Sequence, residues 1–395
     1  MEKIFSSIAG LDVHQKQIVA CILREPVRGK KVSKEIRNFD TTTPQLRQLN
    51  DWLIAEKIEA VVMESTGQYW RPVWNMLDGN FDKILAHPNE VKNLKGRKTD
   101  RKDAEHIADV TMHGLVRGSY VPDEQTQELR LLTRSRYNFQ QEVTRKKNQI
   151  HNILQTANIK LTTYLTDIYG ATGRSFINLL LDGEVITLEK VTELRHGRVK
   201  ASAQQLLDSL DGKLSRVQRI LLQRLFQSID EINSHMEELN QLIDEHTSSH
   251  QINFDILKEL PGVSSKTAEV FMAEVGWNVD AFPTKEHLAS WAGLSPGSYE
   301  SGGVKKSAHV TRGNKRLKGA LTQAALVASY SKDERFRAKF HNIKSRAGAQ
   351  KAIIAIAHQL LLIMYTLIKR GEHYNSNLAK KKLYPSPRIA DVEQN

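Results

Sequence analysis

Residues 4–24, IFSSIAGLDVHQKQIVACILR, decide the fold of the first part of the chain. Two runs of apolar and β-branched side chains, at residues 4–12 and 17–24, are separated by a polar stretch, which predicts a β-hairpin. A third strand is expected at about residues 34–39, and a helix follows because apolar residues then repeat at helical spacing. The chain therefore begins with three strands that lead into a helix.

The order of the next elements indicates the fold class. We expect a strand ending at Glu64, a helix containing Trp70 and Trp74, a short strand at residues 83–86, and helical segments to about residue 116. The resulting order, β-β-β-α-β-α-β-α, is that of an RNase H-like α/β layer.

Four carboxylates lie at positions where this layer would bring them together. Asp100 and Asp103, in the stretch KTDRKDA at residues 98–104, are three apart and share one face of a helix. Asp12 and Glu64 each close a strand-like run. Taken singly, such acids are usually caps, turns or a solvated helix face. Together they offer the hard oxygen ligands that two Mg²⁺ ions need to flank a scissile phosphate.

Composition favours a polyanionic partner. The chain has 57 Lys and Arg against 45 Asp and Glu, a net charge of +12. Nucleic acid is the first expectation, and an anionic membrane surface is the rival, although the charge is not concentrated in one amphipathic helix. Cys21 is the single cysteine, which excludes an intrachain disulfide and fits a reducing, cytoplasmic setting. The apolar segment at 352–368 is short and carries His358 and Gln359, so we expect a buried core helix and no membrane partner.

The rest of the 395 residues is expected to be helical, giving an α/β plus all-α protein. Two heptad seams predict two long helices that pair with each other or with another subunit. Their members are Leu129, Leu132, Arg136, Phe139, Val143, Lys146, Ile150, Ile153 and Ala157 in the first, and Leu222, Leu225, Ile229, Ile232, Met236, Leu239 and Ile243 in the second. The predicted regions are 1–125, the α/β domain; 126–250, a helical coiled-coil region expected to complete that domain and to mediate oligomerisation; 251–375, mainly helical; and 376–395, a flexible tail.

Three motifs in the first region resemble those of a known family. Gly10-Leu11-Asp12-Val13-His14, Met63-Glu64-Ser65-Thr66-Gly67 and the stretch at 98–104 are similar to the motifs of the DEDD insertion-sequence transposases. These are recombinases with a RuvC-like N-terminal domain, whose members are guided by a bridge RNA. The resemblance implies that Asp12, Glu64, Asp100 and Asp103 are the family's acidic tetrad, which holds Mg²⁺ or Mn²⁺. It also implies donor and target double-stranded DNA, a non-coding guide RNA and a homo-oligomer, dimer or tetramer, as partners. His14, His87 and His106 are candidates to touch this site, although each is expected to be structural or exposed.

The same family has a C-terminal transposase domain with a recognisable signature. Ala292-Gly293-Leu294-Ser295-Pro296, Ser301-Gly302 and Arg312-Gly313-Asn314 before a basic helix resemble it. By this match Ser301 corresponds to the family's nucleophilic serine, which would attack phosphorus and hold a DNA end as a phosphoserine ester. Without the family, Ser301 and the two glycines after it are simply a flexible turn.

Several positions are candidates for phosphate contacts. The basic candidates flank the acids or begin the basic helix: Lys98, Arg101, Lys102, Arg312, Lys315, Arg316 and Lys318. Their alternative is a solvated basic face. Leu260-Pro261-Gly262-Val263-Ser264 resembles a helix-hairpin-helix turn, whose backbone N–H groups near Gly262 would hold a phosphate. It has Ser264 where a second glycine is usual, and the alternative is an ordinary helix cap.

Three functions fit these features. The preferred one is an RNA-guided DNA recombinase of an insertion sequence that acts through a phosphoserine. The first alternative is a RuvC-like metal-dependent nuclease that uses activated water, in which Ser301 is incidental. The second alternative is a non-catalytic nucleic-acid-binding protein, in which Asp12 carries no function.

Overall fold

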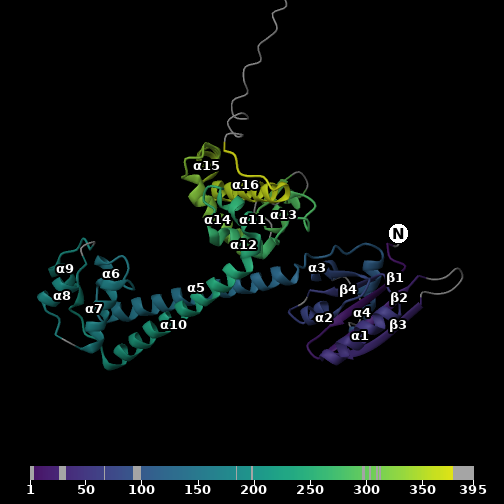
Figure 1. Cartoon of the computed structure of the whole chain (residues 1–395), viewed down its shortest axis with the longest axis horizontal. Coiled ribbons are helices and arrows are strands. Elements are labelled where there is room, and N and C mark those ends of the chain that lie inside the picture. The colour runs from purple at the N-terminus through teal and green to yellow at the C-terminus, as the bar shows by residue number, and fades with distance from the viewer. Residues whose placement is uncertain are drawn as a thin grey trace, which may run out of the picture. The chain divides into compact units, whose positions relative to one another are not determined.

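The computed structural model describes residues 4–25, 33–65, 67–91, 99–183, 185–196, 199–295, 299–301, 304–307, 310 and 313–376 (Figure 1). For residues 89–90, 299–301 and 304–307 it describes the backbone alone. The chain divides into two compact units, Met1–Val121 and Pro122–Asn395, called here the first and second unit. The break lies close to the predicted end of the α/β domain.

The first unit is built on a sheet of five strands in the order β3-β2-β1-β4-β5. The strands are β1 (Ser7–Val13), β2 (Gln17–Arg24), β3 (Ser33–Asp40), β4 (Ala60–Glu64) and β5 (Asp82–Ala86). β1 pairs antiparallel with β2, and β2 with β3, so the predicted hairpin is confirmed. β4 is parallel to β1 and to β5. The carboxyl ends of β1, β4 and β5 therefore lie at one edge of the sheet.

Helices cover both faces of this sheet. Successive side chains of a strand point to opposite faces, so a strand that is apolar throughout needs packing partners on both. The helices are α1 (Thr43–Ala55), α2 (Trp70–Met76), α3 (Pro88–Val91) and α4 (Asp100–Met112). Ala9 and Leu11 of β1 pack in one core with α1 residues such as Leu49. Ile8 of β1 packs on the other face with α4 residues such as Ile107. The predicted order of strands and helices is confirmed.

Two long helices dominate the first part of the second unit: α5 (Glu124–Thr156) and α10 (Arg216–Thr247). They run side by side, and four short helices between them in sequence gather at one end (Figure 1). These are α6 (Leu161–Tyr164), α7 (Ala171–Asp182), α8 (Leu188–Leu194) and α9 (Ala203–Leu210). Seam residues including Val143, Ile150, Leu222 and Ile229 are buried in one shared core. The seams therefore pair within one chain, the first of the two expected arrangements.

The rest of the second unit contains α16 (Ala349–Arg370) and six further described helices, several of which pack against α16. The six are the 3₁₀ helix η1 (Ser248–His250), α11 (Gln251–Lys258), α12 (Ser265–Val275), α13 (Lys285–Trp291), α14 (Lys315–Ser329) and α15 (Glu334–Ala347). A hairpin of β6 (Tyr299–Ser301) and β7 (Val304–Ser307) lies between α13 and α14 in sequence. α16 is long and apolar enough to cross a membrane by length and composition. Every residue from 352 to 368 is nevertheless buried or half-buried, as expected of a core helix.

The helical middle of the chain packs directly on its C-terminal part. α12 lies against α5 and α14 within the second unit. The guanidinium of Arg136 on α5 donates to Asn240 on α10 at 2.9 Å and also to Glu269 on α12. One member of the predicted apolar seam is therefore a charged residue that ties three helices together. The predicted division of this unit at residue 250 stays a prediction.

Candidate metal centre and transposase motifs

The approach of α4 to β1 depends on Gly10. A Cβ atom on residue 10 would lie 2.8 Å from the backbone nitrogen of Ala108, and closer still to the carbonyl oxygen of Ala104. Only glycine leaves room for a helix backbone at this distance, and the two alanines keep the facing side of α4 flat. The first turn of α4 is thereby held over the carboxyl end of β1.

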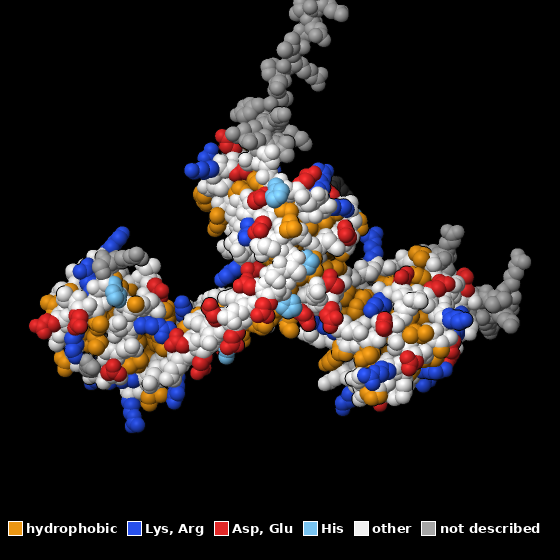
Figure 2. All heavy atoms as spheres, in the orientation of Figure 1, with side chains coloured by type: hydrophobic (Ala, Val, Ile, Leu, Met, Phe, Trp, Pro, Cys, Tyr) orange, Lys and Arg blue, Asp and Glu red, His pale blue; other side chains and the backbone are white. Residues whose placement is uncertain are grey.

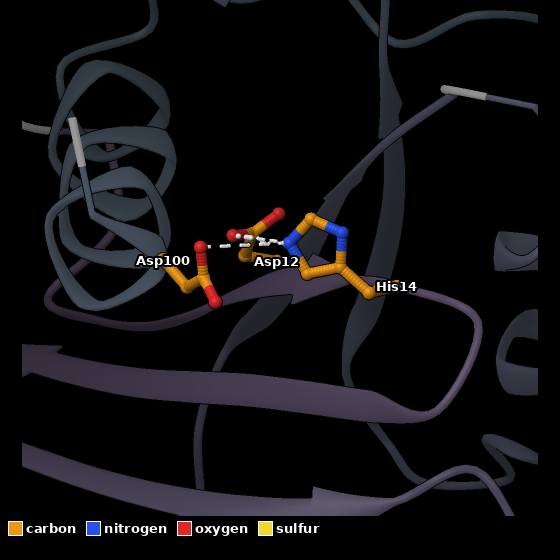
Figure 3. Close-up of side chains that lie close together, drawn as sticks. All are labelled: Asp12, His14 and Asp100. Carbon is orange, nitrogen blue, oxygen red and sulfur yellow. Dashed lines mark hydrogen bonds and ion pairs between the residues drawn. The ribbon is translucent and has the colours of Figure 1, made fainter.

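Three side chains from different elements meet at that point (Figure 3). Asp12 comes from the end of β1, His14 from the turn after it, and Asp100 from the first position of α4. The Nε2 atom of His14 lies 3.2 Å from Oδ2 of Asp12 and 3.7 Å from Oδ1 of Asp100. One ligand atom from each residue lies within 4.8 Å of the other two. Of the three histidines considered as neighbours of the site, His14 is exposed, as expected, and also contacts two of the acids.

The charges at this site repel one another. Burial raises the pKa of Asp12; His14 lowers it, but the nearby charges of Asp100 and Asp103 raise it further, and the net result is a raised pKa. The Asp12 side chain is 15% exposed, whereas those of His14 and Asp100 are more than half exposed. A half-buried acid beside further acids is stabilised by a cation, so the arrangement fits a metal-binding role.

Glu64 and Asp103 lie beside this group without belonging to it. β1 and β4 are parallel with Leu11 opposite Met63, so Asp12 and Glu64 follow as neighbours at the ends of adjacent strands. Side chains that are an even number of residues apart in a strand point to the same face of the sheet. Ile8 precedes Asp12 in this way, and Val62 precedes Glu64. Because Ile8 and Val62 pack against α4, both acids lie on the face that α4 covers. Asp103 influences the pKa of Asp12 through its charge. The structure thus places Asp12 and Asp100 in a close group with His14, and Glu64 and Asp103 at its margin.

The donor set suits a hard divalent cation. Carboxylate oxygens are the preferred ligands of Mg²⁺ and Mn²⁺, and an imidazole nitrogen is accepted more readily by Mn²⁺. Thr99 caps α4 by accepting from the backbone nitrogen of Lys102 at 3.4 Å, which fixes the first turn on which Asp100 stands. Arg101 and Lys102 are exposed on the same turn, whereas Lys98 lies outside the described residues.

Two of the C-terminal motifs are in direct contact in the second unit: the one that contains Ala292 and Gly293, and the one that contains Gly313 and Asn314. A Cβ on Gly313 would lie 2.6 Å from the carbonyl carbon of Ala292 and closer still to the backbone nitrogen of Gly293. The backbone nitrogen of Asn314 also donates to the carbonyl oxygen of Trp291 at 3.1 Å. The motifs therefore hold together the two ends of the segment that carries Ser301.

Ser301 is the last residue of β6. It pairs with Val304 of β7, so it stands where the hairpin turns. The two glycines that follow it, and Arg312, lie outside the described residues. The role of Ser301 stays a prediction.

A buried carboxylate that the sequence did not single out holds the base of this segment. Glu274 on α12 accepts two hydrogen bonds of 2.8 Å from Arg134 on α5, and one of 2.7 Å from Nδ2 of Asn314. The Asn314 side chain also accepts from the first backbone nitrogens of α14 as its N-cap. Burial alone would raise the pKa of Glu274, but the hydrogen bonds and the charges of Arg130 and Arg134 outweigh it and lower the pKa.

The predicted phosphate contacts at the start of α14 have different environments. Lys315 is exposed and Lys318 is half-buried. The guanidinium of Arg316 lies 3.8 Å from the ring centre of Tyr137 and donates to Asn138 at 3.0 Å. Arg316 therefore joins α14 to α5, a structural role that the sequence analysis missed.

Gly262 has a packing role. Its φ is +82°, and a Cβ there would lie 2.8 Å from the backbone nitrogen of Ala328 and closer still to the carbonyl oxygen of Ala324 on α14. Ser264 caps α12 by accepting from the backbone nitrogen of Thr267 at 3.3 Å. The helix-cap alternative therefore describes Ser264, and a phosphate contact at this turn stays a prediction.

Comparisons with known proteins match both units. A family model for DEDD transposases of the IS110 type, described as a transposase, matches residues 9–159. A second, described as the transposase IS116/IS110/IS902 family, matches residues 254–341. These spans contain the acidic motifs and the C-terminal motifs respectively.

Curated relatives match either most of this chain or about a third of it. An uncharacterized 43.6 kDa protein of insertion element IS110 from Streptomyces coelicolor is 28% identical over 71% of this chain and 73% of its own length. Pilin gene-inverting proteins of Moraxella bovis and Moraxella lacunata are each 29% identical over 31% of this chain and 39% of their own lengths. The resemblance found in the sequence motifs is confirmed: the chain belongs to the IS110-type family of DNA transposases.

Proposed function

We propose that this chain is an RNA-guided DNA recombinase of an insertion sequence, which exchanges strands through a phosphoserine at Ser301 with the help of a metal-binding acidic tetrad. The observation that carries the proposal is the meeting of Asp12, His14 and Asp100 at the carboxyl edge of the sheet. The strand order, with β1, β2 and β3 antiparallel in succession and β4 and β5 parallel to β1, is that expected of an RNase H or RuvC-like domain. Family membership supports the remaining assignments.

The acids would hold Mg²⁺ or Mn²⁺, which supplies positive charge beside a scissile phosphate. Asp12 on β1 and Asp100 on α4 would hold the ion, and Glu64 and Asp103 would complete the set from the edge of the group. His14 hydrogen-bonds to Asp12 and is more than half exposed, which supports a role as the base that would accept the proton of an attacking hydroxyl.

Ser301 would act as the nucleophile of the first step. Its Oγ forms a bond to phosphorus, the bond from phosphorus to the leaving sugar oxygen breaks, and the serine proton passes to a base. The freed sugar oxygen takes up a proton and leaves as a hydroxyl. In the second step a hydroxyl end of the other DNA attacks the phosphoserine, which joins the new strands and regenerates Ser301.

The partners in this proposal are donor and target double-stranded DNA, a bridge RNA and further copies of the chain. The net charge of +12 supports nucleic-acid partners. Figure 2 shows Lys and Arg side chains spread over the visible faces of both units, interspersed with acids. The described cations predicted to contact phosphates are Arg101, Lys102, Lys315, Arg316 and Lys318. The protein would be cytoplasmic and would join the nucleoid when bound to DNA.

The test is whether the protein forms a covalent adduct with DNA. The purified protein, with its co-purified RNA, is incubated with labelled target DNA and Mg²⁺, and the denatured products are examined for protein-linked DNA. Wild type should form the adduct, and Ser301→Ala should abolish it. Ser307→Ala, on the other strand of the same hairpin, is the matched control and should retain the adduct.

The same experiment separates the alternatives. DNA cleavage that persists in Ser301→Ala without any adduct would establish the water-activating nuclease instead. Strand exchange that persists in Asp12→Asn would show that the acids carry no function, as the non-catalytic alternative requires.

A further inference from the structure

A cavity of about 800 Å³ lies in the second unit, between α15, α16 and the segment that follows α16. α15 contributes Arg335 and Lys339, which are one turn apart on one face. α16 contributes residues at helical spacing, from Gln359 through Leu362 and Ile363 to Thr366. None of these residues belongs to the motifs described above, so the cavity is a separate site.

The rim of the cavity is strongly basic. Its cationic or titratable basic residues are Lys285, Arg335, Lys339, Arg370 and His373. Glu372 is the one acidic side chain among the lining residues, and it lies 3.7 Å from Arg370. His373 is paired with Glu259 at 2.7 Å. The remaining positive charge has no acidic counterpart within the lining.

Lys339 is the cation best placed to take an anion. Among the described side chains, no carboxylate lies within ion-pair distance of its ammonium group. Burial lowers the pKa of Lys339, which means that its charge is poorly solvated where it stands. An anion in the cavity would restore that lost solvation.

The floor of the cavity combines apolar side chains with one unpaired amide. Leu362, Ile363 and Leu367 provide apolar surface. The Oε1 atom of Gln359 is buried and has no hydrogen-bond partner. A buried polar atom without a partner is unfavourable, and Gln359 lines the cavity, so a ligand group that pairs with its side-chain amide would remove that cost.

These features match the parts of a nucleotide. The bases have apolar faces and hydrogen-bonding edges, and the phosphate is an anion. We propose that this cavity binds one unstacked nucleotide, with its phosphate on Lys339 and Arg335, its base over the apolar floor and its base edge on Gln359. The choice of nucleotide over another phosphate compound rests on the proposed function. The nucleotide can come from single-stranded nucleic acid or from a free mononucleotide, since both offer the same groups.

The test measures binding of a fluorescein-labelled oligothymidylate to the full-length protein by anisotropy. Lys339→Gln should weaken binding about tenfold, as expected for loss of one charge-assisted hydrogen bond. Lys351→Gln, an exposed lysine on α16 outside the lining, is the matched control for the general loss of one charge. It should weaken binding less than twofold.

A second variant separates binding from folding. Gln359→Leu removes an amide oxygen that has no partner, so the thermal unfolding midpoint should stay the same or rise. Oligothymidylate binding should nevertheless weaken several-fold. A purely structural glutamine would not give a stable protein with weaker binding.

The outcomes of these measurements decide whether the cavity binds a nucleotide and where that nucleotide comes from. Equal effects of Lys339→Gln and Lys351→Gln, together with wild-type binding by Gln359→Leu, would overturn it. If it holds, competition by thymidine 5′-monophosphate assigns the cavity to a mononucleotide, and competition by unlabelled oligothymidylate alone assigns it to a single strand. The covalent adduct at Ser301 is scored separately, so its absence would refute the recombinase mechanism while leaving the cavity result standing.

Discussion

Gly10 in β1 and Ala108 in α4 lie so close that a Cβ atom on residue 10 would be 2.8 Å from the backbone nitrogen of Ala108. This contact fixes the distance between Asp12, two residues further along β1, and Asp100 at the start of α4. Gly10 has no side chain that could bind a metal, yet it sets how closely two candidate metal ligands approach each other.

Gly10→Ala should force α4 away from the sheet. Because the atoms in the way belong to a helix backbone, the strain cannot be relieved by rotating a side chain, and we expect a loss of about 3 kcal/mol. Thermal unfolding measures it. Gly319→Ala, in α14 where no atom lies within 4 Å of the new Cβ, is the matched control and should not destabilise. Equal midpoints for the two variants would contradict the packing argument.

Metal binding should stabilise the wild-type protein. A ligand that binds the folded state at about a hundred times its Kd adds roughly 2.7 kcal/mol, so saturating Mg²⁺ or Mn²⁺ should raise the unfolding midpoint. Asp12→Asn should abolish this rise. Without metal, the variant should be as stable as wild type or slightly more so, because it removes one of several acids that repel each other.

The control for the metal experiment is Asp109→Asn, near the far end of α4, where the aspartate pairs with His113 at 3.6 Å. This variant should keep the full metal response. If Asp109→Asn loses the response as much as Asp12→Asn does, the metal effect is general electrostatics and does not arise at the predicted site.

Local sequence patterns predicted the elements that carry the acids, because they depend on short-range regularities. Continuous runs of apolar residues identified β1 and β4, and the ends of these runs placed Asp12 and Glu64. The spacing of Asp100 and Asp103 identified one face of α4. A central strand that is buried on both faces is apolar along most of its length. These strands, and the acids at their ends, could therefore be predicted from the sequence.

Contacts between distant segments left no such signal. The hydrogen bond from His14 to Asp12 depends on how the β1–β2 turn directs a side chain. The role of Glu274 depends on Arg134 and Asn314, which lie in other helices. Glu274 itself is an acid within an apolar helix, the one feature that would have indicated a buried partner.

Glu274 should make the second unit sensitive to acid. Its pKa is lower in the folded protein than its ordinary value of 4.5. Its stabilisation is therefore complete above about pH 4.5 and is lost as the pH falls toward the folded pKa. Glu274→Gln should cost about 3 kcal/mol at neutral pH, because Arg134 and Arg130 lose their buried partner. The variant's stability should fall less steeply below pH 4.5 than that of wild type.

Denaturant unfolding at several pH values measures this effect. Glu237→Gln, at an exposed position of α10, is the control and should follow the wild-type pH profile within about 0.5 kcal/mol. Parallel pH profiles for Glu274→Gln and wild type would show that the carboxylate is not responsible for the acid sensitivity.

Gly313→Ala should separate catalysis from folding of the helical core. The new Cβ would meet the backbone at Ala292 and Gly293, so the two motifs must part, and the segment that they close, with Ser301 on it, loses its fixed base. α14 keeps its cap, because Asn314 follows the change and its side chain still reaches Glu274. We expect the Ser301 adduct to fall at least tenfold. The unfolding midpoint should fall as well, because Ala292 and Gly293 are buried, but the protein should stay folded at the assay temperature. Gly348→Ala, where nothing lies within 4 Å of the added Cβ although φ is +88°, controls for loss of a glycine and should retain the adduct. An adduct at wild-type level in Gly313→Ala would mean that the contact between the two motifs does not position the serine.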